Sequence, residues 1–220
     1  ITDLPKGRGN IKTIVVPEEK RSQVMDKISK ECALGRQSYW VCPLIEESEE
    51  LNFQAAESTY VFLQEKLKRL SIGLVHGKLS SVKKTKAMEN FINGHTNILV
   101  ATTVIEVGVD VANSSVMVIE NAERLGLTQL HQLRGRVGRG RHESVCILLY
   151  KKPLSSVAKE RLAVIRATND GFLIAEKDLQ LRGPGELLGT RQKGLIGLRI
   201  ADIMRDAYLL PAINKLTVNI

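Results

Sequence analysis

Short runs of apolar, mostly β-branched residues recur along the first two thirds of the chain and alternate with longer amphipathic stretches. Several of the runs are unbroken apolar segments, as expected of strands buried on both faces of a sheet. The predicted strands cover residues 11–16, 38–45, 72–76, 97–102, 115–120 and 144–150. Helix signals between them mark residues 21–34, 55–70, 80–93 and a helix capped by Thr128. This alternation predicts an α/β fold, a doubly wound parallel sheet flanked by helices.

The pattern changes after Tyr150, where no further strand is indicated. Helices are predicted from Ser155 or Ser156 to about Thr168, around 175–181 and around 201–210, where Pro211 ends the last one. The glycine-rich stretch LRGPGELLGTRQKGLIG separates the last two and predicts a shaped loop. We therefore expect two units, a sheet domain of residues 1–152 and a small helical appendage of residues 153–220.

Charge changes this picture by indicating a partner. Lys and Arg number 32 against 24 Asp and Glu, which gives a formal net charge of +8 and favours polyanionic partners. Aromatic residues make up only 4% of the chain, so a platform that stacks single-stranded bases is not indicated. A surface that reads phosphates fits this composition better.

The cysteines, the histidines and the hydropathy exclude several classes. Cys32, Cys42 and Cys146 are odd in number and form no C-x-x-C pair, so neither a disulfide framework nor a zinc site is predicted. No apolar run reaches the length of a membrane span, and no signal peptide opens the chain. We expect a cytoplasmic protein with reduced thiols and no bound metal of its own. The chain begins in a basic, linker-like stretch, LPKGRGN, so we also expect it to be part of a longer protein.

The stretch QLRGRVGRGR, residues 132–141, carries four arginines and no carboxylate. Helical spacing would place Gln132, Arg136 and Arg139 along one side of a helix. Gly135 and Gly138 each cost a helix about 1 kcal/mol relative to alanine, so their presence indicates a close approach by something. A solvated charged surface is the default for such a run, but arginines without acids favour an anion. We interpret the stretch as a phosphate-binding segment.

A second candidate segment, ATTVIEVGVDV, follows the predicted strand 97–102. Ligands of doubly wound sheets bind beyond the carboxyl ends of the strands, where Thr102 and Thr103 offer hydroxyls that suit a nucleic-acid backbone. Capping of a helix is an equally good interpretation of these threonines. Gly108 permits a close approach, and Asp110 places a carboxylate near the same edge or serves only as a turn residue.

No segment of the sequence qualifies as a nucleotide-binding P-loop. GLVHGK, residues 73–78, is one residue too short, and Leu79 stands where the magnesium-binding hydroxyl belongs. The half of a nucleotide site that cradles ATP and magnesium is therefore absent from the sequence.

ATTVIEVGVDV followed by QLHQLRGRVGRG resembles motifs V and VI of the superfamily 2 helicases. YWVCPLIEESE, GLVHGKLS, TNDGF and LRGPGELLGTRQKG extend the resemblance to the RecG family of bacterial, ATP-dependent helicases for branched DNA. The resemblance implies the second RecA-like domain of the motor, followed by a translocation motif. ATP and Mg²⁺ would be held mainly by the first RecA-like domain. Implied partners are branched or double-stranded DNA and, in the same polypeptide, that first domain and an amino-terminal DNA-wedge domain.

The resemblance also implies roles for individual residues. Arg139 and Arg136 would face the ATP γ-phosphate, with Arg139 as the arginine finger. The remaining implied roles are nucleotide contacts by Gln132, Gly108 and Asp110, DNA-backbone contacts by Thr102, Thr103, His76 and Gly77, and coupling of hydrolysis to movement by Arg182, Arg191 and Gln192. The chain departs from the family pattern at Ala112, where proline is expected, and in KLSSVKKTK. The alternatives are the motor of the transcription-repair coupling factor Mfd and a passive nucleic-acid-binding module without hydrolysis.

Overall fold

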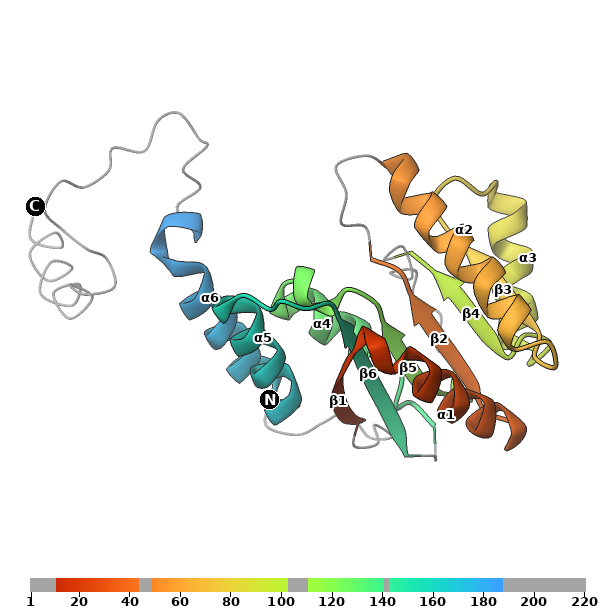
Figure 1. The fold of residues 1–220 in the computed structure, drawn as a ribbon, viewed down its shortest axis with the longest axis horizontal. Helices are drawn as coiled ribbons and strands as arrows, with labels where there is room; N and C mark the ends of the chain where they lie inside the picture. Colours follow the sequence, from red (N-terminus) through yellow and green to blue (C-terminus); the bar gives the residue numbers. More distant parts are fainter. Residues whose placement is uncertain (1–10, 44–48, 103–110, 141–142, 188–220) are drawn as a thin grey trace, which may run out of the picture.

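The computed structural model describes residues 11–43, 49–102, 111–140 and 143–187 (Figure 1). Six strands form one sheet in the order β1-β6-β5-β2-β4-β3, and every neighbouring pair is parallel. The strands are β1 (Ile11–Pro17), β2 (Gln37–Val41), β3 (Ile72–Val75), β4 (Ile98–Ala101), β5 (Ser114–Ile119) and β6 (Ser144–Tyr150). All six predicted strands are confirmed, although β2 ends earlier than residue 45.

Helices cover both faces of the sheet. The described helices are α1 (Arg21–Ala33), α2 (Glu49–Lys66), α3 (Ser81–Ile92), α4 (Leu127–Arg134), α5 (Ser156–Ala167) and α6 (Gly171–Leu187), with short 3-10 turns η1 (Glu18–Lys20) and η2 (Ala122–Arg124). One face packs against α1 and α2, and the other packs against α3, α4, α5 and α6. The predicted RecA-like, doubly wound architecture is therefore confirmed.

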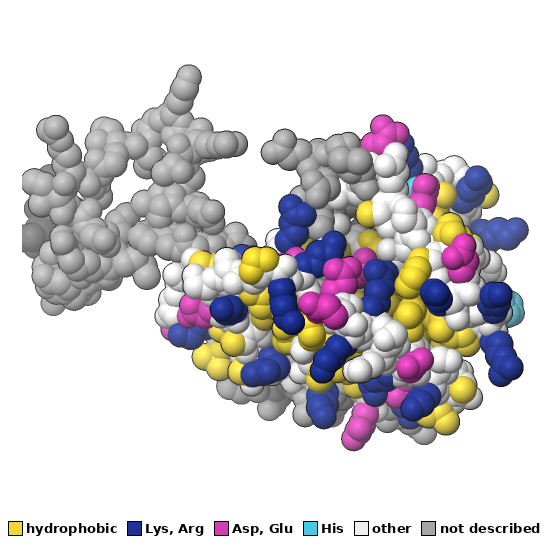
Figure 2. All heavy atoms as spheres, viewed as in Figure 1, with side chains coloured by type: hydrophobic (Ala, Val, Ile, Leu, Met, Phe, Trp, Pro, Cys, Tyr) yellow, Lys and Arg dark blue, Asp and Glu magenta, His cyan; other side chains and the backbone are white. Residues whose placement is uncertain are grey.

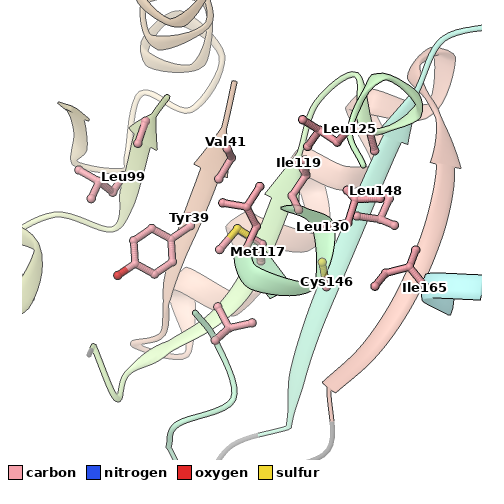
Figure 3. Close-up of a cluster of buried hydrophobic side chains, with 14 of the residues drawn as sticks. Tyr39, Val41, Leu99, Met117, Ile119, Leu125, Leu130, Cys146, Leu148 and Ile165 are labelled. Carbon is pink, nitrogen blue, oxygen red and sulfur yellow. The ribbon is translucent and has the colours of Figure 1, made fainter. Parts of the chain in front are cut away.

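Alternation along the buried strands builds the two cores. On β2, Tyr39 and Val41 face the α3–α6 side, whereas Trp40 faces the α1–α2 side. Figure 3 shows part of the first of these cores, in which side chains of β2, β5 and β6 lie in one buried cluster with Leu130 of α4. Trp40 and Leu130 are completely buried, as expected where a sheet is covered on both faces.

The start of α4 differs from the expectation that Thr128 caps it. The helix begins at Leu127, and the side chain of Gln129 accepts a hydrogen bond from the Gly126 N–H at 3.0 Å. The Thr128 hydroxyl instead donates to Asp178 Oδ2 of α6 at 2.8 Å. A long-range partner has replaced the local cap, so Thr128 joins α4 to α6.

Helices α2 and α6 are longer than predicted. α2 starts at Glu49 rather than near residue 55, and α6 runs from Gly171 to Leu187, through Gly183–Gly185 where a loop was expected. Asp170 starts α6 by accepting the Phe172 N–H at 2.8 Å. Because Pro184 lies in the last turn of the helix, it removes only one intrahelical hydrogen bond.

The described part of the appendage belongs to the same core as the sheet. Leu162 and Ile165 of α5 and Ile174 of α6 lie in one buried cluster with Met117 of β5 and Cys146 of β6. A division between residues 1–152 and 153–220 thus separates elements that share a core up to α6, and it stays a prediction. The helix predicted around 201–210 lies outside the described residues.

Within the described ranges, no helix is both long and apolar enough to cross a membrane. All three cysteines are free and buried. Burial raises the pKa of the Cys146 thiol to about 12, which keeps it protonated at neutral pH.

Candidate nucleotide and nucleic-acid site

The arginine segment, residues 135–140, lies beyond the end of α4 and not on it. The helix ends at Arg134, and Gly138 adopts a left-handed backbone with φ 81°. The expectation that Gln132, Arg136 and Arg139 share one side of a helix is therefore wrong, because the helix stops before both arginines. The chain leaves α4 through a turn that only glycine adopts without strain.

The glycine of the segment with the closest contact is Gly140. A Cβ at Gly140 would lie 2.1 Å from the backbone oxygen of Ala112, which no side chain could tolerate. The close approach was expected at Gly135 and Gly138, whereas the contact in the structure lies at Gly140, and its partner is the chain just before β5. Ala112, where the family pattern has proline, holds the turn against the amino end of that strand.

Arg136 and Arg139 are both half-buried and lie on the connection from α4 to the amino end of β6, next to Gly140, which packs against Ala112 just before β5. The Nε of Arg139 donates to the Gly135 carbonyl at 3.4 Å, a long hydrogen bond within the turn. Gln132, on the last turn of α4, is exposed. The structure therefore brings Arg136 and Arg139 together on one turn, with Gln132 on the helix that leads into it.

Arg134, the first arginine of the stretch, points inward and is only 2% exposed. Its Nη1 donates to the carbonyls of Ile165 at 2.8 Å and Thr168 at 2.9 Å, where α5 ends. A cation at the carboxyl end of a helix satisfies carbonyls that have no intrahelical partner and interacts favourably with the helix dipole. This arginine needs no external anion.

Arg134 is a structural residue that the sequence analysis did not single out. Burial lowers the pKa of the Arg134 guanidinium, although an arginine keeps its charge in proteins. Its acceptors are backbone carbonyls of residues far along the chain. Every residue has a backbone carbonyl, so the sequence does not indicate which ones accept a hydrogen bond. A run of arginines therefore looks uniform in sequence while its members differ in environment.

The predicted DNA-contacting residues lie at the other end of the sheet. Thr102 follows β4 and His76 follows β3, and both positions are at the carboxyl ends of neighbouring strands, as expected. Thr102 is fully buried and His76 is 3% exposed. Among the described residues, neither the Thr102 hydroxyl nor the ring nitrogens of His76 have a hydrogen-bond partner.

His76 is enclosed by aromatic and charged neighbours. Its ring lies 5.3 Å from that of Phe53, and Nε2 lies 3.4 Å from Glu57 Oε1, both on α2. Burial lowers the pKa of His76, with smaller contributions from Lys84 and Lys78, while Glu57 acts in the opposite direction. The imidazole is therefore held in its neutral form.

Gly77 is confined between α2 and α3. A Cβ there would lie 3.1 Å from the ring of Phe53, so a larger residue would require that ring to shift by a few tenths of an ångström. The Gly77 carbonyl accepts a hydrogen bond from Lys84 Nζ of α3 at 2.6 Å. Gly77 thus fixes the start of the β3–α3 connection beside His76.

The remaining candidate residues fall where the structure gives no side chain. Thr103, Gly108, Asp110, Arg191 and Gln192 lie outside the described residues, and Arg182 lies on α6 without a described side chain. Within the described ranges, no cluster of His, Cys, Asp or Glu side chains is suited to a metal ion.

Charge is spread over the surface rather than gathered in one stripe on the face shown in Figure 2. Lys and Arg side chains are scattered over this face, with Asp and Glu side chains between them. Several charges of the described residues are paired, for example Lys152 with Glu19 at 3.5 Å and Lys78 with Glu50 at 3.0 Å. The net positive charge therefore does not by itself locate a nucleic-acid track on this face.

The sequence profile of the helicase conserved C-terminal domain matches residues 18–141. The profile of ATP-dependent DNA helicase RecG, domain 3, C-terminal, matches residues 168–220. ATP-dependent DNA helicase RecG of Escherichia coli strain K12 is 54% identical over 100% of this chain. The RecG proteins of Acidithiobacillus ferridurans and Bacillus subtilis are 56% and 45% identical over 98% and 100% of the chain. The chain spans 32% of the length of each of these relatives.

Solved structures give the same result for the fold. RecG bound to a three-way DNA junction has a TM-score of 0.72 and 44% identity, and the match covers 94% of this chain and 26% of that one. Domain 2 of the DEAD-box helicase Mss116p, bound to an RNA duplex, has a TM-score of 0.53 and 18% identity over 78% of this chain and 69% of that one, which shows likeness of fold alone. The chain belongs to the helicase conserved C-terminal domain family, and it is similar along its whole length to the carboxyl-terminal part of RecG.

Proposed function

We propose that this chain is the second RecA-like half of the motor of a bacterial, cytoplasmic ATP-dependent DNA helicase that remodels branched DNA. The observation that carries the proposal is the arginine segment, a glycine-shaped turn that holds two half-buried arginines together in a chain 54% identical to RecG of E. coli. The substrate class is inferred from a relative, since one solved RecG structure is bound to a three-way DNA junction.

In this proposal, Arg139 acts as an arginine finger and Arg136 assists it at the γ-phosphate. A guanidinium brought to a transferring phosphoryl group stabilises the charge that develops there, and such fingers contribute about 10³ to 10⁵ in turnover. Gln132, Gly108 and Asp110 contact the nucleotide from the same side. ATP and Mg²⁺ are held mainly by the first RecA-like domain of the full-length protein, so hydrolysis requires the two domains to close.

The carboxyl ends of β3 and β4 form the DNA side in this proposal. Thr102, Thr103, His76 and Gly77 contact or shape the track for the DNA backbone, and phosphate contacts there would carry no sequence preference. Arg182, Arg191 and Gln192 transmit domain closure to movement along duplex DNA. The amino-terminal DNA-wedge domain expected in the full-length protein recognises the branch.

The experiment compares the chain alone with the chain mixed with a purified first RecA-like domain that carries the P-loop. We expect no ATP hydrolysis by the chain alone and DNA-stimulated hydrolysis by the mixture and by the full-length protein. DNA binding without hydrolysis in the full-length protein would establish the passive module instead. Displacement of a stalled RNA polymerase, without activity on branched DNA, would establish a motor of the Mfd type.

A further inference from the structure

The five residues TNDGF, Thr168–Phe172, connect α5 to α6 and form a compact, internally bonded turn. The Thr168 hydroxyl accepts the Asp170 N–H at 3.0 Å, and Asp170 Oδ1 in turn accepts the Phe172 N–H at 2.8 Å. Asn169 adds a tie to β1 through a hydrogen bond from Nδ2 to the Ile11 carbonyl at 3.3 Å. The turn is therefore held by hydrogen bonds within itself and by one hydrogen bond to β1.

Two residues of α4, His131 and Arg134, meet this turn. Arg134 Nη1 donates to the Thr168 carbonyl at 2.9 Å and to the Ile165 carbonyl at 2.8 Å. At Gly171, an added Cβ would lie only 3.1 Å from His131 Nε2, so the imidazole occupies the space that a side chain would need. The glycine of TNDGF thus makes room for the histidine of α4.

The two α4 residues also bind each other. His131 Nδ1 lies 3.0 Å from Arg134 Nη2. A guanidinium has only donors, so the imidazole nitrogen must be the acceptor. The other ring nitrogen, Nε2, is the one that faces Gly171.

This arrangement constrains Arg134 from two sides. Because the guanidinium is planar, fixing Nη2 on the imidazole sets the direction in which Nη1 points, which is toward the carbonyls of Ile165 and Thr168. Arg134 is 2% exposed, so water is not available to replace a lost acceptor. The next residues along the chain are the turn that holds Arg136 and Arg139.

We propose that His131 is a positioning residue that orients Arg134. Both side chains pack against the TNDGF turn, and this contact, which we call the joint, connects the arginine segment to α6. His131 acts through Arg134, with which it is in contact, and not on the nucleotide or the DNA. A displacement of the arginine segment on nucleotide binding therefore reaches the start of α6 through two side chains. This inference rests on the proposed motor function only for its consequence in coupling, since the joint itself is a contact within the chain.

Three substitutions separate an acceptor role from a packing role. His131→Asn keeps an acceptor oxygen near the place of Nδ1, His131→Gln moves the acceptor toward the place of Nε2, and His131→Leu keeps bulk without an acceptor. His95, an exposed histidine, supplies the matched control His95→Leu. Each variant is made in the full-length protein, and DNA-stimulated ATP hydrolysis, unwinding of a DNA fork and the urea unfolding equilibrium are measured together.

We expect the amount of fork unwound per ATP to fall about tenfold in the Leu and Gln variants and to stay within about twofold in the Asn variant, as for one lost hydrogen bond to a buried cation. The unfolding equilibrium constant should likewise rise more in the Leu and Gln variants than in the Asn variant. Equal effects of Asn, Gln and Leu, or an effect as large in His95→Leu, would overturn the proposal. If the wild-type protein shows no DNA-stimulated hydrolysis, the motor function fails, and the order of the unfolding constants still decides the joint.

A second pair of variants tests whether the His131 imidazole packs against Gly171 of the TNDGF turn. Gly171→Ala should shift the unfolding equilibrium against the native state, because its Cβ meets His131, whereas His131→Ala should remove that clash. We expect Gly171→Ala to raise the unfolding equilibrium constant by a factor at least three times smaller in the His131→Ala background than in the wild type, because the effects of changes at residues in contact are coupled. Additive effects of the two changes would show that the imidazole does not sit on Gly171, and the proposal would fail.

Discussion

The two ends of the parallel sheet present their candidate functional groups in opposite ways. On the connection to the amino end of β6, Arg136 and Arg139 are half-buried on a turn that is closed by the contact of Gly140 with the Ala112 carbonyl. At the carboxyl ends of β3 and β4, Thr102 and His76 are buried. The first end holds its cations at the surface, while the second keeps its polar atoms inside.

This difference indicates that the two ends need different conformational changes before their side chains can contact a phosphate. A half-exposed guanidinium on a shaped turn needs only the arrival of a second domain, since its backbone is already in place. A buried hydroxyl or imidazole cannot reach a phosphate until its surroundings move. Domain closure would therefore suffice at the arginine end, and a local rearrangement is needed at the threonine end.

The largest effect is expected at the arginine end. Arg139→Ala in the full-length protein should lower DNA-stimulated turnover about a thousandfold while the affinity for ATP changes only a few-fold, because the guanidinium acts mainly in the transition state. Steady-state ATPase kinetics combined with nucleotide titration measure both quantities. Arg166→Ala, which removes an exposed arginine from α5, is the matched control and should leave turnover unchanged. Weakened ATP binding with normal turnover would contradict the assignment.

Arg134 should behave unlike its neighbours because it faces inward. Arg134→Met leaves the Ile165 and Thr168 carbonyls without their donor, so we expect a loss of about 2–3 kcal/mol in the free energy of unfolding. Denaturant unfolding checks this value, and Arg139→Ala should change it by less than about 0.5 kcal/mol. Equal stability of the two variants would remove the distinction between the inward and outward arginines.

Thr102 tests the buried end. Thr102→Val keeps the shape and removes a hydroxyl that has no hydrogen-bond partner among the described residues, so the protein should be as stable as the wild type or more stable by about 1 kcal/mol. DNA affinity should nevertheless fall without sequence preference, as for a lost backbone contact. Denaturant unfolding measures the stability of the variant, and a salt titration of DNA binding measures its affinity for DNA. Undiminished affinity would mean that the hydroxyl never leaves the interior.

The smallest effect concerns His76 and pH. Burial lowers the pKa of His76 in the folded state, so the unfolded chain binds the proton more readily. The stability that depends on the neutral imidazole is present above its ordinary pKa, near 6.5, and is lost as the pH falls below it. His76→Gln should therefore lose less stability than the wild type between about pH 7 and pH 5. Parallel unfolding curves at several pH values measure the difference, and His95→Gln is the exposed control, expected to follow the wild type.

The sheet could be read from the sequence because each buried strand is a short, unbroken apolar run. Residues 98–101, for example, are all buried, and no polar position interrupts the pattern. The position of Thr102 followed from the same logic, since parallel strands end at one edge, whereas His76 was assigned through the family resemblance. Their burial did not follow, and for His76 it depends on Phe53, which belongs to the separate element α2.

The arginine stretch shows where local patterns are insufficient. Helical spacing treated residues 132–139 as one helix, but Gly138 takes a left-handed conformation and the helix stops at Arg134. The contact between Gly140 and Ala112 joins segments whose proximity no spacing rule encodes. The opposite error occurred in α6, where Gly183–Gly185 suggested a loop although the helix continues to Leu187. In both places tertiary packing decided an outcome that local propensity left open.

The order of the strands has a consequence for the synthesis of the protein. Among the described strands β1 lies at an edge and pairs with β6 alone, and Ile11 pairs with Ser144 at the start of their shared ladder. At common rates of translation, on the order of ten seconds pass between the emergence of these two residues from the ribosome. During that interval β1 has no strand to pair with, and non-local parallel pairing is slow even once both strands exist. The nascent chain must therefore complete this side of its sheet last, after the strands that carry the threonine and histidine have already met.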